Sequence, residues 1–183
     1  IALNAWSALF VFLGAFFYAI VYTVWLKRRT WLNIVFGGLA GSWAVLAGAT
    51  AADPQLGAVP LSLALVLFLW TPPHFWSLAI AFRDDYAAAG VPMLPVVVGD
   101  QRAANTIFAS TLALVAASLL PLAFGLGPIY FAGAAIGGFL FIQKAWLLTR
   151  QPNRKTAMVC FHASLMQLTL VLCAAIVDTQ LRF

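Results

Sequence analysis

Charged residues are scarce in this sequence, and glutamate is absent altogether. Only 8% of the 183 residues are charged and 64% are hydrophobic, whereas a soluble domain carries about 25% charged residues. The mean hydropathy is +0.98. This composition excludes an ordinary soluble domain, and we predict a single all-α integral membrane domain over residues 1–183.

Cysteine and histidine are also rare, which excludes several kinds of site. Cys160 and Cys173 are 13 positions apart in one predicted helix. At about 1.5 Å of rise per residue they are too far apart to form a disulfide with each other, and we interpret both as small core residues. The sequence contains no zinc-ligand spacing, no Walker loop and no Ser-His-Asp arrangement, so it does not indicate a zinc enzyme, a P-loop NTPase or a triad hydrolase.

Long apolar runs make up most of the chain. Each is long enough to cross the hydrocarbon core of a bilayer, which takes about 20 residues. Two pairs of glycines four positions apart, Gly37 with Gly41 and Gly133 with Gly137, indicate close packing of helices. We therefore predict a polytopic transmembrane helix bundle. Its six expected spans are Ala5–Leu26, Asn33–Ala51, Val59–Phe82, Ala103–Leu122, Ile129–Thr149 and Thr156–Val177.

The basic residues gather on one side of these spans, which we call the X face. If consecutive spans alternate in direction, nine of the ten Lys and Arg residues fall on this face, and such an excess marks the cytoplasmic or matrix side. The charges are spread over three short loops, so they do not indicate a nucleic-acid partner. The nine are Lys27, Arg28, Arg29, Arg83, Arg102, Lys144, Arg150, Arg154 and Lys155, with Arg182 on the opposite face.

Two adjacent carboxylates stand at the X end of the third span, in the sequence Arg83-Asp84-Asp85-Tyr86. Charge near the membrane is costly and therefore calls for a reason. Carboxylate oxygens are preferred ligands of Mg²⁺, and cationic side chains neutralise phosphate. We therefore predict that Asp84 and Asp85 bind a Mg²⁺ ion on a diphosphate. The alternative is a solvated helix end in which Arg83 pairs with an aspartate.

The loop after the first span, Lys27-Arg28-Arg29, lies on the same face as these acids. Lys27 and Arg28, together with Arg83, are candidates for binding the diphosphate. An anchor on lipid headgroups is the alternative interpretation.

A proline-rich segment, Gly90-Val91-Pro92-Met93-Leu94-Pro95, follows the acidic pair. Two prolines after a glycine stop a helix. Non-helical backbone near a membrane survives where it lines a cavity or is buried in protein. We predict a lid or wall over a pocket that opens to the X face, and a plain connector is the alternative.

The only two histidines are predicted to lie at similar depth. His74 is eight residues before Phe82 and His162 is six residues after Thr156, so both are a short way in from the X face. Two histidines at equal depth suggest an alternative function, a haem-binding electron-transfer membrane subunit with both imidazoles as ligands. The alternative for each histidine is a polar group bonded to a neighbouring helix.

Two stretches, TPPHFWSLAIAFRDDYAAAGVPMLPVV and VYTVWLKRRTWLNIVFGGLAGS, resemble the haem-modifying branch of the UbiA superfamily of membrane prenyltransferases. The resemblance implies a nine-helix bundle around one cavity, of which the six spans here match the fourth to the ninth. It implies transfer of a farnesyl group from farnesyl diphosphate to a vinyl group of haem B, which gives haem O for haem–copper oxidase assembly. It also implies an integral protein of a bacterial inner (plasma) or a mitochondrial inner membrane, with oxidase-assembly proteins as partners besides the lipid bilayer.

The resemblance also assigns roles to residues. It makes Arg83-Asp84-Asp85-Tyr86 the second of two acidic motifs that hold Mg²⁺ on the diphosphate. Substrate contacts are then expected from His74, Tyr22 and Tyr86.

This sequence departs from the superfamily pattern in three respects. Asp53 is the only acid among residues 1–82 and lies on the opposite face, so the first acidic motif has no counterpart here. We therefore expect a fragment that lacks the first three helices and is inactive alone. Many relatives space the two aspartates of the second motif four apart, whereas here they are adjacent, as in the haem-modifying branch. The superfamily pattern also has a tyrosine four positions before a loop lysine. Here Thr23 stands four positions before Lys27, and the tyrosine, Tyr22, stands five positions before it.

Overall fold

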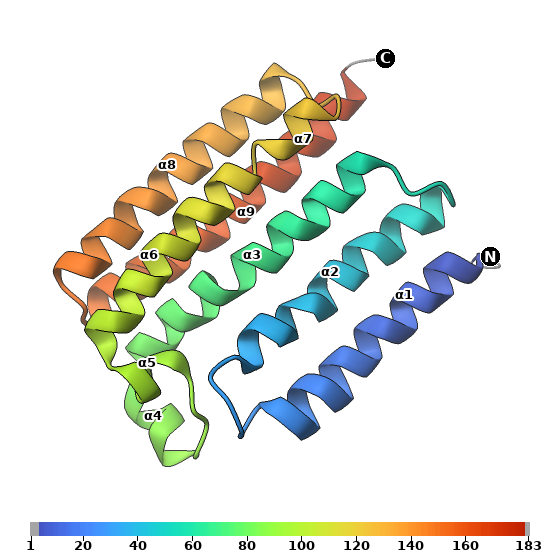
Figure 1. Cartoon of the computed structure of the whole chain (residues 1–183). Coiled ribbons are helices and arrows are strands. Elements are labelled where there is room, and N and C mark those ends of the chain that lie inside the picture. Colours follow the sequence, from blue (N-terminus) through green and yellow to red (C-terminus); the bar gives the residue numbers. More distant parts are fainter. Residues whose placement is uncertain (1–3, 182–183) are drawn as a thin grey trace.

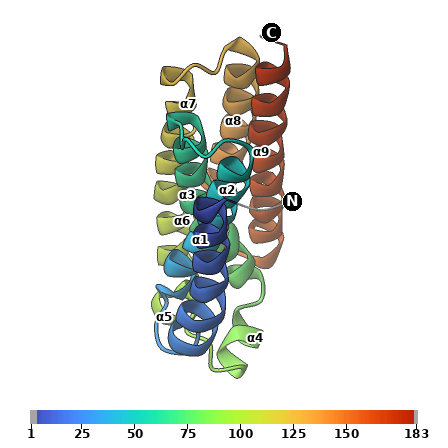
Figure 2. The same ribbon diagram turned by 90° about the vertical axis from the view of Figure 1, so that its right-hand side faces the viewer.

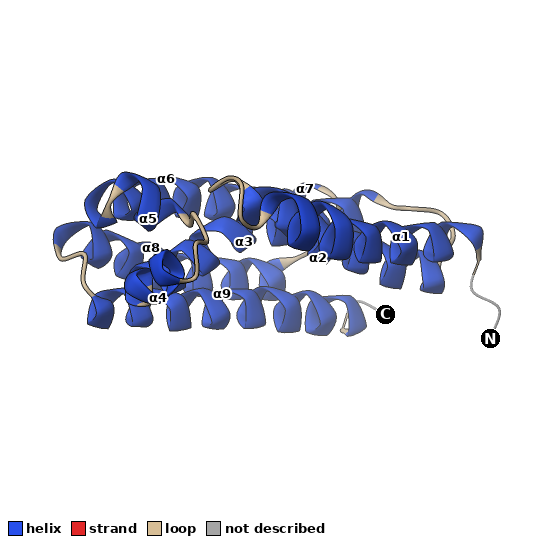
Figure 3. Cartoon of the chain, turned by 90° about the horizontal axis from the view of Figure 1, so that it is seen from below, coloured by secondary structure: helices blue, strands red, loops and turns tan. Residues whose placement is uncertain are grey.

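The computed structural model describes residues 4–181, and over this range it consists of helices and loops (Figure 3). The all-α prediction is confirmed, and six helical segments are long and apolar enough to span a membrane. Arg182, the basic residue assigned to the opposite face, is outside the described residues. The elements are α1 (Ala5–Phe16) continued by η1 (Phe17–Leu26), α2 (Asn33–Ala52), α3 (Ala58–Ala81), α4 (Arg83–Ala88), α5 (Leu94–Val98), α6 (Asp100–Ala117), α7 (Leu120–Ala123), α8 (Pro128–Arg150) and α9 (Arg154–Gln180).

The spans form a four-helix bundle with a two-helix extension. Helices α3, α6, α8 and α9 pack in a ring, each against its neighbours, and α2 and then α1 continue outward from α3 in one layer (Figure 1). Figure 2 shows this layer edge-on. Both ends of the chain lie at one end of the spans, and the short helices α4 and α5 lie at the other (Figure 1). This second end is the X face.

Helix α3 is the centre of the core because it packs against α2, α6 and α9. Most of its residues between Trp70 and Ile80 are buried, including Pro72 and Pro73, and the helix runs through both prolines without a break. A buried polar contact fixes it to α9: the Trp70 indole N–H donates to the Ser164 carbonyl at 2.8 Å. A hydrogen bond of this kind satisfies groups that lipid cannot.

Small residues allow α8 and α9 to approach closely. A Cβ added at Gly133 would lie 2.5 Å from the Ala174 Cβ, and one added at Gly137 would lie 3.0 Å from the Gln167 Cα. Both positions therefore need glycine for the two backbones to meet, which is the packing predicted from the four-residue spacing.

Asp178 has a structural role that the sequence did not reveal. Its carboxylate is buried at the end of α9 and accepts hydrogen bonds from the backbone N–H groups of Gly127 at 2.6 Å, Ile129 at 3.2 Å and Tyr130 at 3.4 Å. These donors belong to the start of α8, which Pro128 opens. The carboxylate thus satisfies free N–H groups of one helix end and interacts favourably with its dipole.

The first prediction concerns topology. Single cysteines at Ala88 and Gln151, in a background without Cys160 and Cys173, should react with an impermeant reagent from one side of the membrane. A cysteine at Gln55 should react from the other side. All three positions are exposed loop or helix-end residues. We expect the first side to be cytoplasmic because of the excess of basic residues. Labelling of Gln55 and Ala88 from one side would disprove the arrangement of spans.

The second prediction concerns Asp178. Asp178→Ala should lower stability by about 1–3 kcal/mol because it leaves buried N–H groups without an acceptor. Asp178→Asn, which keeps one acceptor oxygen, should lower it less. Thermal unfolding in detergent measures both, with Asp53→Ala as the exposed control that should change little. Equal melting temperatures for Asp178→Ala and Asp53→Ala would refute the capping role.

Candidate functional site

An acidic cleft of about 510 Å³ opens on the X face, where α3 ends and α4 begins. Phe82 interrupts the two helices with φ −123° and ψ 33°, and Asp84 and Asp85 then fall in the first turn of α4. Both carboxylates are exposed. The start of a helix favours negative charge. The cleft is lined by Ile80, Ala81, Phe82, Arg83, Asp84, Asp85, Asp100 and Arg154.

Two residues of this cleft, Asp100 and Arg154, were not singled out from the sequence. Asp100 is the first residue of α6 and Arg154 the first of α9, so each reaches the cleft from a helix that starts on the X face. Arg83 pairs with Asp100 at 3.5 Å, and the Arg154 guanidinium lies 5.2 Å from the centre of the Phe82 ring. The sequence could have indicated both residues, because each is the first residue of a span that follows a loop on the X face. Only the fold shows that these two helix starts lie at the same cleft.

The carboxylates fit a metal ion that brings further ligands with it. Among residues 4–181, no cluster of three or more His, Cys, Asp or Glu side chains is close enough to hold a metal. Mg²⁺ is usually held by one or two carboxylates, with water and substrate phosphate completing the shell. The second oxygen of Asp100, Oδ1, is buried and has no hydrogen-bond partner within the described residues. Asp84 and Asp85, which line one cleft with Asp100, fit a Mg²⁺–diphosphate unit.

Lys27 and Tyr22 lie together in a second cleft of about 230 Å³. The Lys27 Nζ is 5.9 Å from the centre of the Tyr22 ring. The cleft is lined by Tyr18, Tyr22, Lys27, Ile34, Gly37, Thr71 and Phe75. It is thus an aromatic pocket with one ammonium group at its polar end, and it brings together two of the residues predicted from the sequence.

Arg28 lies in neither of these clefts. Together with Arg29 it lines a third cleft, of about 360 Å³, whose other wall includes Gly90, Val91 and Pro92. The structure therefore places the predicted phosphate-binding residues Arg83, Lys27 and Arg28 around three neighbouring clefts of one face.

The proline-rich segment is the wall of this third cleft. Gly90 has φ +65°, a left-handed conformation suited to glycine, and ends α4. Its N–H donates to the Ala87 carbonyl at 3.0 Å, and the Val91 N–H donates to the Tyr86 carbonyl at 2.9 Å, which is a Schellman motif. Val91, Met93 and Leu94 are then buried in the core. Of the predicted lid or wall, the segment is therefore the wall: it is packed against the core and lines the third cleft.

Tyr86 lies in α4, directly after the acidic pair. It is half-buried against the core, and burial raises the pKa of its phenol above the ordinary value of 10.0, so the hydroxyl stays protonated at neutral pH. The phenol is close enough to that of Tyr22 for the two to interact electrostatically. A neutral hydroxyl here is a hydrogen-bond donor one residue after Asp85.

The two histidines do not share an environment. His74 is buried; its Nδ1 is 2.7 Å from the Ser164 Oγ, and its ring stacks on Trp70 at 4.0 Å and on Phe161 at 4.5 Å between ring centres. His162 is exposed, with its Nδ1 2.8 Å from the Met158 carbonyl. The expectation of one haem between two facing imidazoles is therefore not supported. One ring lies inside the bundle and the other on its surface.

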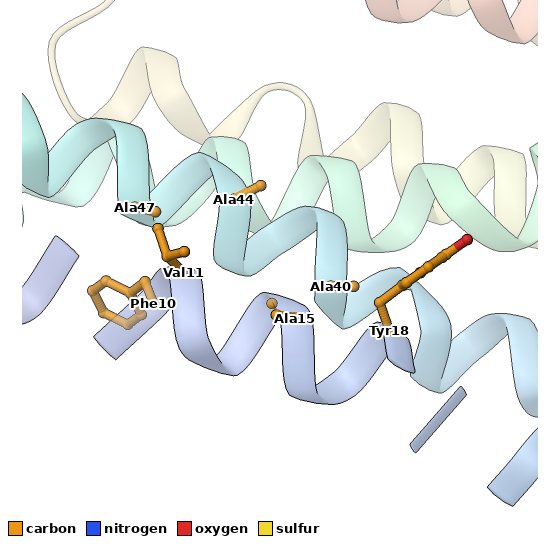
Figure 4. A pocket seen from close by; sticks show the side chains of 8 residues that line it. Phe10, Val11, Ala15, Tyr18, Ala40, Ala44 and Ala47 are labelled. Atoms are coloured by element: carbon orange, nitrogen blue, oxygen red, sulfur yellow. The ribbon is translucent and has the colours of Figure 1, made fainter. Parts of the chain in front are cut away.

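A fourth, apolar groove of about 420 Å³ lies between α1 and α2 (Figure 4). Tyr18 lines this groove and also the Lys27 cleft, so the two meet at that residue. The remaining lining is Phe10, Val11, Gly14, Ala15, Ala40, Ala44 and Ala47. Such a lining suits hydrocarbon and not charge.

Comparison with known families gives a match over most of the chain. A family model described as the UbiA prenyltransferase family matches residues 1–171. A solved structure of digeranylgeranylglyceryl phosphate synthase in membranes superposes with a TM-score of 0.77, at 22% identity, over 96% of this chain and 62% of that chain. At this identity the likeness concerns the fold alone.

Curated relatives are more similar in sequence. Protoheme IX farnesyltransferase 2 of Paramagnetospirillum magneticum (strain ATCC 700264 / AMB-1) is 63% identical over 177 residues, which are 97% of this chain and 62% of that protein. Protoheme IX farnesyltransferase 1 of the same strain is 53% identical over 97% of this chain and 63% of that protein. Protoheme IX farnesyltransferase 1 of Cenarchaeum symbiosum (strain A) is 43% identical over 99% and 61%. The chain thus spans 61% to 63% of the length of these relatives.

Proposed function

The chain belongs to the UbiA prenyltransferase family, and from this premise we propose that it forms the C-terminal part of an enzyme that transfers a farnesyl group from farnesyl diphosphate to a vinyl group of haem B. The product is haem O. The observation that carries the proposal is the cleft in which Asp84 and Asp85 lie beside Arg83 and Arg154. The names of the similar relatives, protoheme IX farnesyltransferases, supply the two substrates.

The two carboxylates are assigned to the diphosphate group of farnesyl diphosphate, where the metal ion would bind. Asp84 and Asp85 would hold a Mg²⁺ ion that, when bound, neutralises charge on the departing diphosphate. Exposed carboxylates at the mouth of a cleft suit this role because an ion can reach them together with the diphosphate. Asp100 holds Arg83 by its ion pair and leaves Oδ1 free for a ligand or water.

The cations stabilise the diphosphate as it leaves. Arg83 and Arg154 line the cleft with the acids, and their guanidinium groups can donate to phosphate oxygens. Lys27 and Arg28 reach from neighbouring clefts of the same face. Groups that are already in place when charge develops lower the barrier most effectively.

The apolar clefts protect the reactive group. As the bond from farnesyl C1 to the diphosphate oxygen breaks, C1 becomes an allylic cation, and a vinyl carbon of haem B forms the new bond to it. Water adds to the carbocation that remains beside the porphyrin ring and releases a proton, which leaves a hydroxyl group on that carbon. Tyr18, Tyr22 and Phe75 line an aromatic cleft near the X face, and such a wall keeps water from the first cation.

We propose that His74 contributes to the haem side of the site. Its ring is held by Ser164 between Trp70 and Phe161, so its orientation is fixed within the bundle. Tyr22, which lines the aromatic cleft, and Tyr86, which directly follows Asp85 on α4, are proposed as substrate contacts. The competing proposal, an electron-transfer subunit with His74 and His162 as haem ligands, lacks a geometric basis because His162 lies on the surface.

The membrane setting follows from the same proposal. We propose that the acidic cleft lies on the cytoplasmic side of a bacterial inner membrane, or on the matrix side of a mitochondrial inner membrane, and that oxidase-assembly proteins are its partners. We propose that this chain alone is inactive, because one acidic cluster leaves part of the diphosphate without ligands. Activity is therefore assayed in the longer enzyme that contains it.

The third prediction tests the acidic cleft. In the longer enzyme, Asp84→Asn and Asp85→Asn should each lower haem O formation at least about tenfold, because each removes a charged ligand of a hard metal ion. Both side chains are exposed, so the amount of folded protein should stay the same. Asp53→Asn, an exposed aspartate on the opposite face, is the control and should be near neutral. Small and equal effects at all three positions would remove the metal assignment.

The fourth prediction separates the two histidines. His74→Ala should weaken haem B binding several-fold, measured by absorbance titration of the purified enzyme. His162→Ala should leave binding unchanged because the exposed ring lies outside the core. Ser164→Ala is the informative companion: it removes the hydroxyl that holds His74 and should show an intermediate effect. An equal loss for both histidine variants, with a spectrum typical of two histidine ligands, would favour the electron-transfer alternative.

A further inference from the structure

Ser164 on α9 takes part in three hydrogen bonds beside His74 on α3. Its carbonyl accepts from the Trp70 indole N–H at 2.8 Å, and its hydroxyl donates to the Phe161 carbonyl at 2.6 Å. The same hydroxyl oxygen lies 2.7 Å from the His74 Nδ1. Ser164 and His74 are both buried. One serine of a neighbouring helix thus holds the imidazole in place.

These contacts decide which ring nitrogen of His74 carries hydrogen. A backbone carbonyl can only accept, so the short contact with Phe161 uses the single hydrogen of the Ser164 hydroxyl. In its other contact the Ser164 oxygen must therefore accept from the His74 Nδ1–H. In the uncharged imidazole the second nitrogen, Nε2, then keeps its lone pair. The tautomer of His74 is therefore set by its bond to Ser164.

The Nε2 edge is the part of the His74 ring that has no partner among residues 4–181. Trp70 stacks on the ring at 4.0 Å and Phe161 at 4.5 Å between ring centres, and Phe75 meets it edge-on at 4.9 Å. The Nδ1 is taken by Ser164. Because the ring is clamped in this way, the lone pair of Nε2 has a fixed direction.

A metal-bound histidine has the same arrangement. A histidine that ligates a metal through one nitrogen almost always donates its other N–H to an oxygen, which fixes the tautomer and makes the ring a stronger ligand. Here that oxygen is the Ser164 hydroxyl, which the Phe161 carbonyl holds in turn. A single imidazole of this kind commonly ligates haem iron.

The depth of His74 suits the iron of a haem and not its reacting vinyl group. His74 precedes Phe82, at which α3 ends, by eight residues, which is about 12 Å of helix rise. Its ring therefore lies well below the acidic cleft, where the diphosphate is proposed to bind. A vinyl group is on the rim of the porphyrin and the iron is at its centre. A haem with one vinyl group near the diphosphate then has its iron deeper in the bundle.

We propose that the His74 Nε2 is the single axial ligand of the haem B iron, and that Ser164 is a positioning residue that keeps this nitrogen unprotonated. The bond to iron fixes the porphyrin relative to α3, so that a vinyl group can be presented to the farnesyl C1. The identity of the ligand rests on the proposed function. The tautomer rests only on the hydrogen bonds of His74, Ser164 and Phe161.

The tautomer is tested on this chain in bilayers, without haem and without an assay of activity. Solid-state NMR of isotope-labelled ring nitrogens distinguishes the two tautomers, and His162→Gln leaves His74 as the only histidine. The uncharged ring should give the Nδ1–H tautomer alone. Ser164→Val should lose this state, and Ser164→Thr, which has a similar shape but keeps the hydroxyl, should retain it. A ring protonated at Nε2 in the otherwise unaltered chain, or equal spectra for the two Ser164 variants, would overturn the proposal.

The bond to iron is tested in the longer enzyme with haem B. Resonance Raman spectra of the ferrous complex should show an iron–histidine vibration that His74→Gly removes and added imidazole restores. His162→Gln should leave it unchanged. Ser164→Val should lower its frequency and weaken haem binding several-fold relative to Ser164→Thr, because the Nδ1–H bond strengthens the ligand. A vibration that survives His74→Gly, or equal frequencies in the two Ser164 variants, would contradict the assignment.

A failure of the proposed function gives a different result from a failure of the ligation. An unaltered enzyme that binds no haem B would refute the proposed function and the iron ligand together, whereas NMR of this chain would still decide the tautomer. Haem B that binds without an iron–histidine vibration would leave the proposed function intact and overturn the role of His74 Nε2.

Discussion

The exclusion of charge from hydrocarbon is the constraint on which the rest of this structure depends. The chain can bury apolar side chains against lipid or against itself, but its carboxylates and cations must lie at the ends of the spans. Asp84, Asp85, Asp100, Arg83 and Arg154 therefore meet at one end, around a single cleft. Concentrating both signs of charge on one face, next to apolar clefts, creates a surface suited to an amphiphile with a charged head and a hydrocarbon chain.

Inside the spans, polar groups persist only where the protein satisfies them. The Trp70 indole and the His74 imidazole both bond to Ser164, which fixes α3 to α9 just below the X face. At the opposite end, the buried Asp178 carboxylate accepts three N–H groups at the start of α8. These contacts hold the four-helix bundle at both ends. The residues of the acidic cleft, which come from the end of α3, Phe82, α4, α6 and α9, therefore keep their mutual positions.

The spans, the X face and the acidic pair could be predicted because they depend on local properties: run length, charge distribution and adjacency in the sequence. What could not be predicted depends on tertiary contacts. Arg154 lines the same cleft as Asp84 because α9 starts beside α4. The two histidines have different surroundings because the His74 ring on α3 is buried and the His162 ring on α9 is exposed. The pairing of Tyr22 with Lys27 depends on a π-helix over Phe17–Leu26, which no residue spacing indicates. The capping role of Asp178 likewise depends on partners at the start of α8, about 50 residues earlier in the chain.

The central claim is that a divalent ion and a diphosphate bind at the acidic end of the spans. Mn²⁺ can replace Mg²⁺, and its paramagnetic effect on a nitroxide measures their separation. In the longer enzyme with farnesyl diphosphate, Mn²⁺ should strongly broaden a nitroxide at Ala88, about one helical turn from Asp85. It should leave one at Gln55, across about 30 Å of hydrocarbon, unaffected. Asp84→Asn combined with Asp85→Asn should abolish the broadening. Broadening at Gln55, or broadening at Ala88 that survives the loss of both carboxylates, would contradict the account.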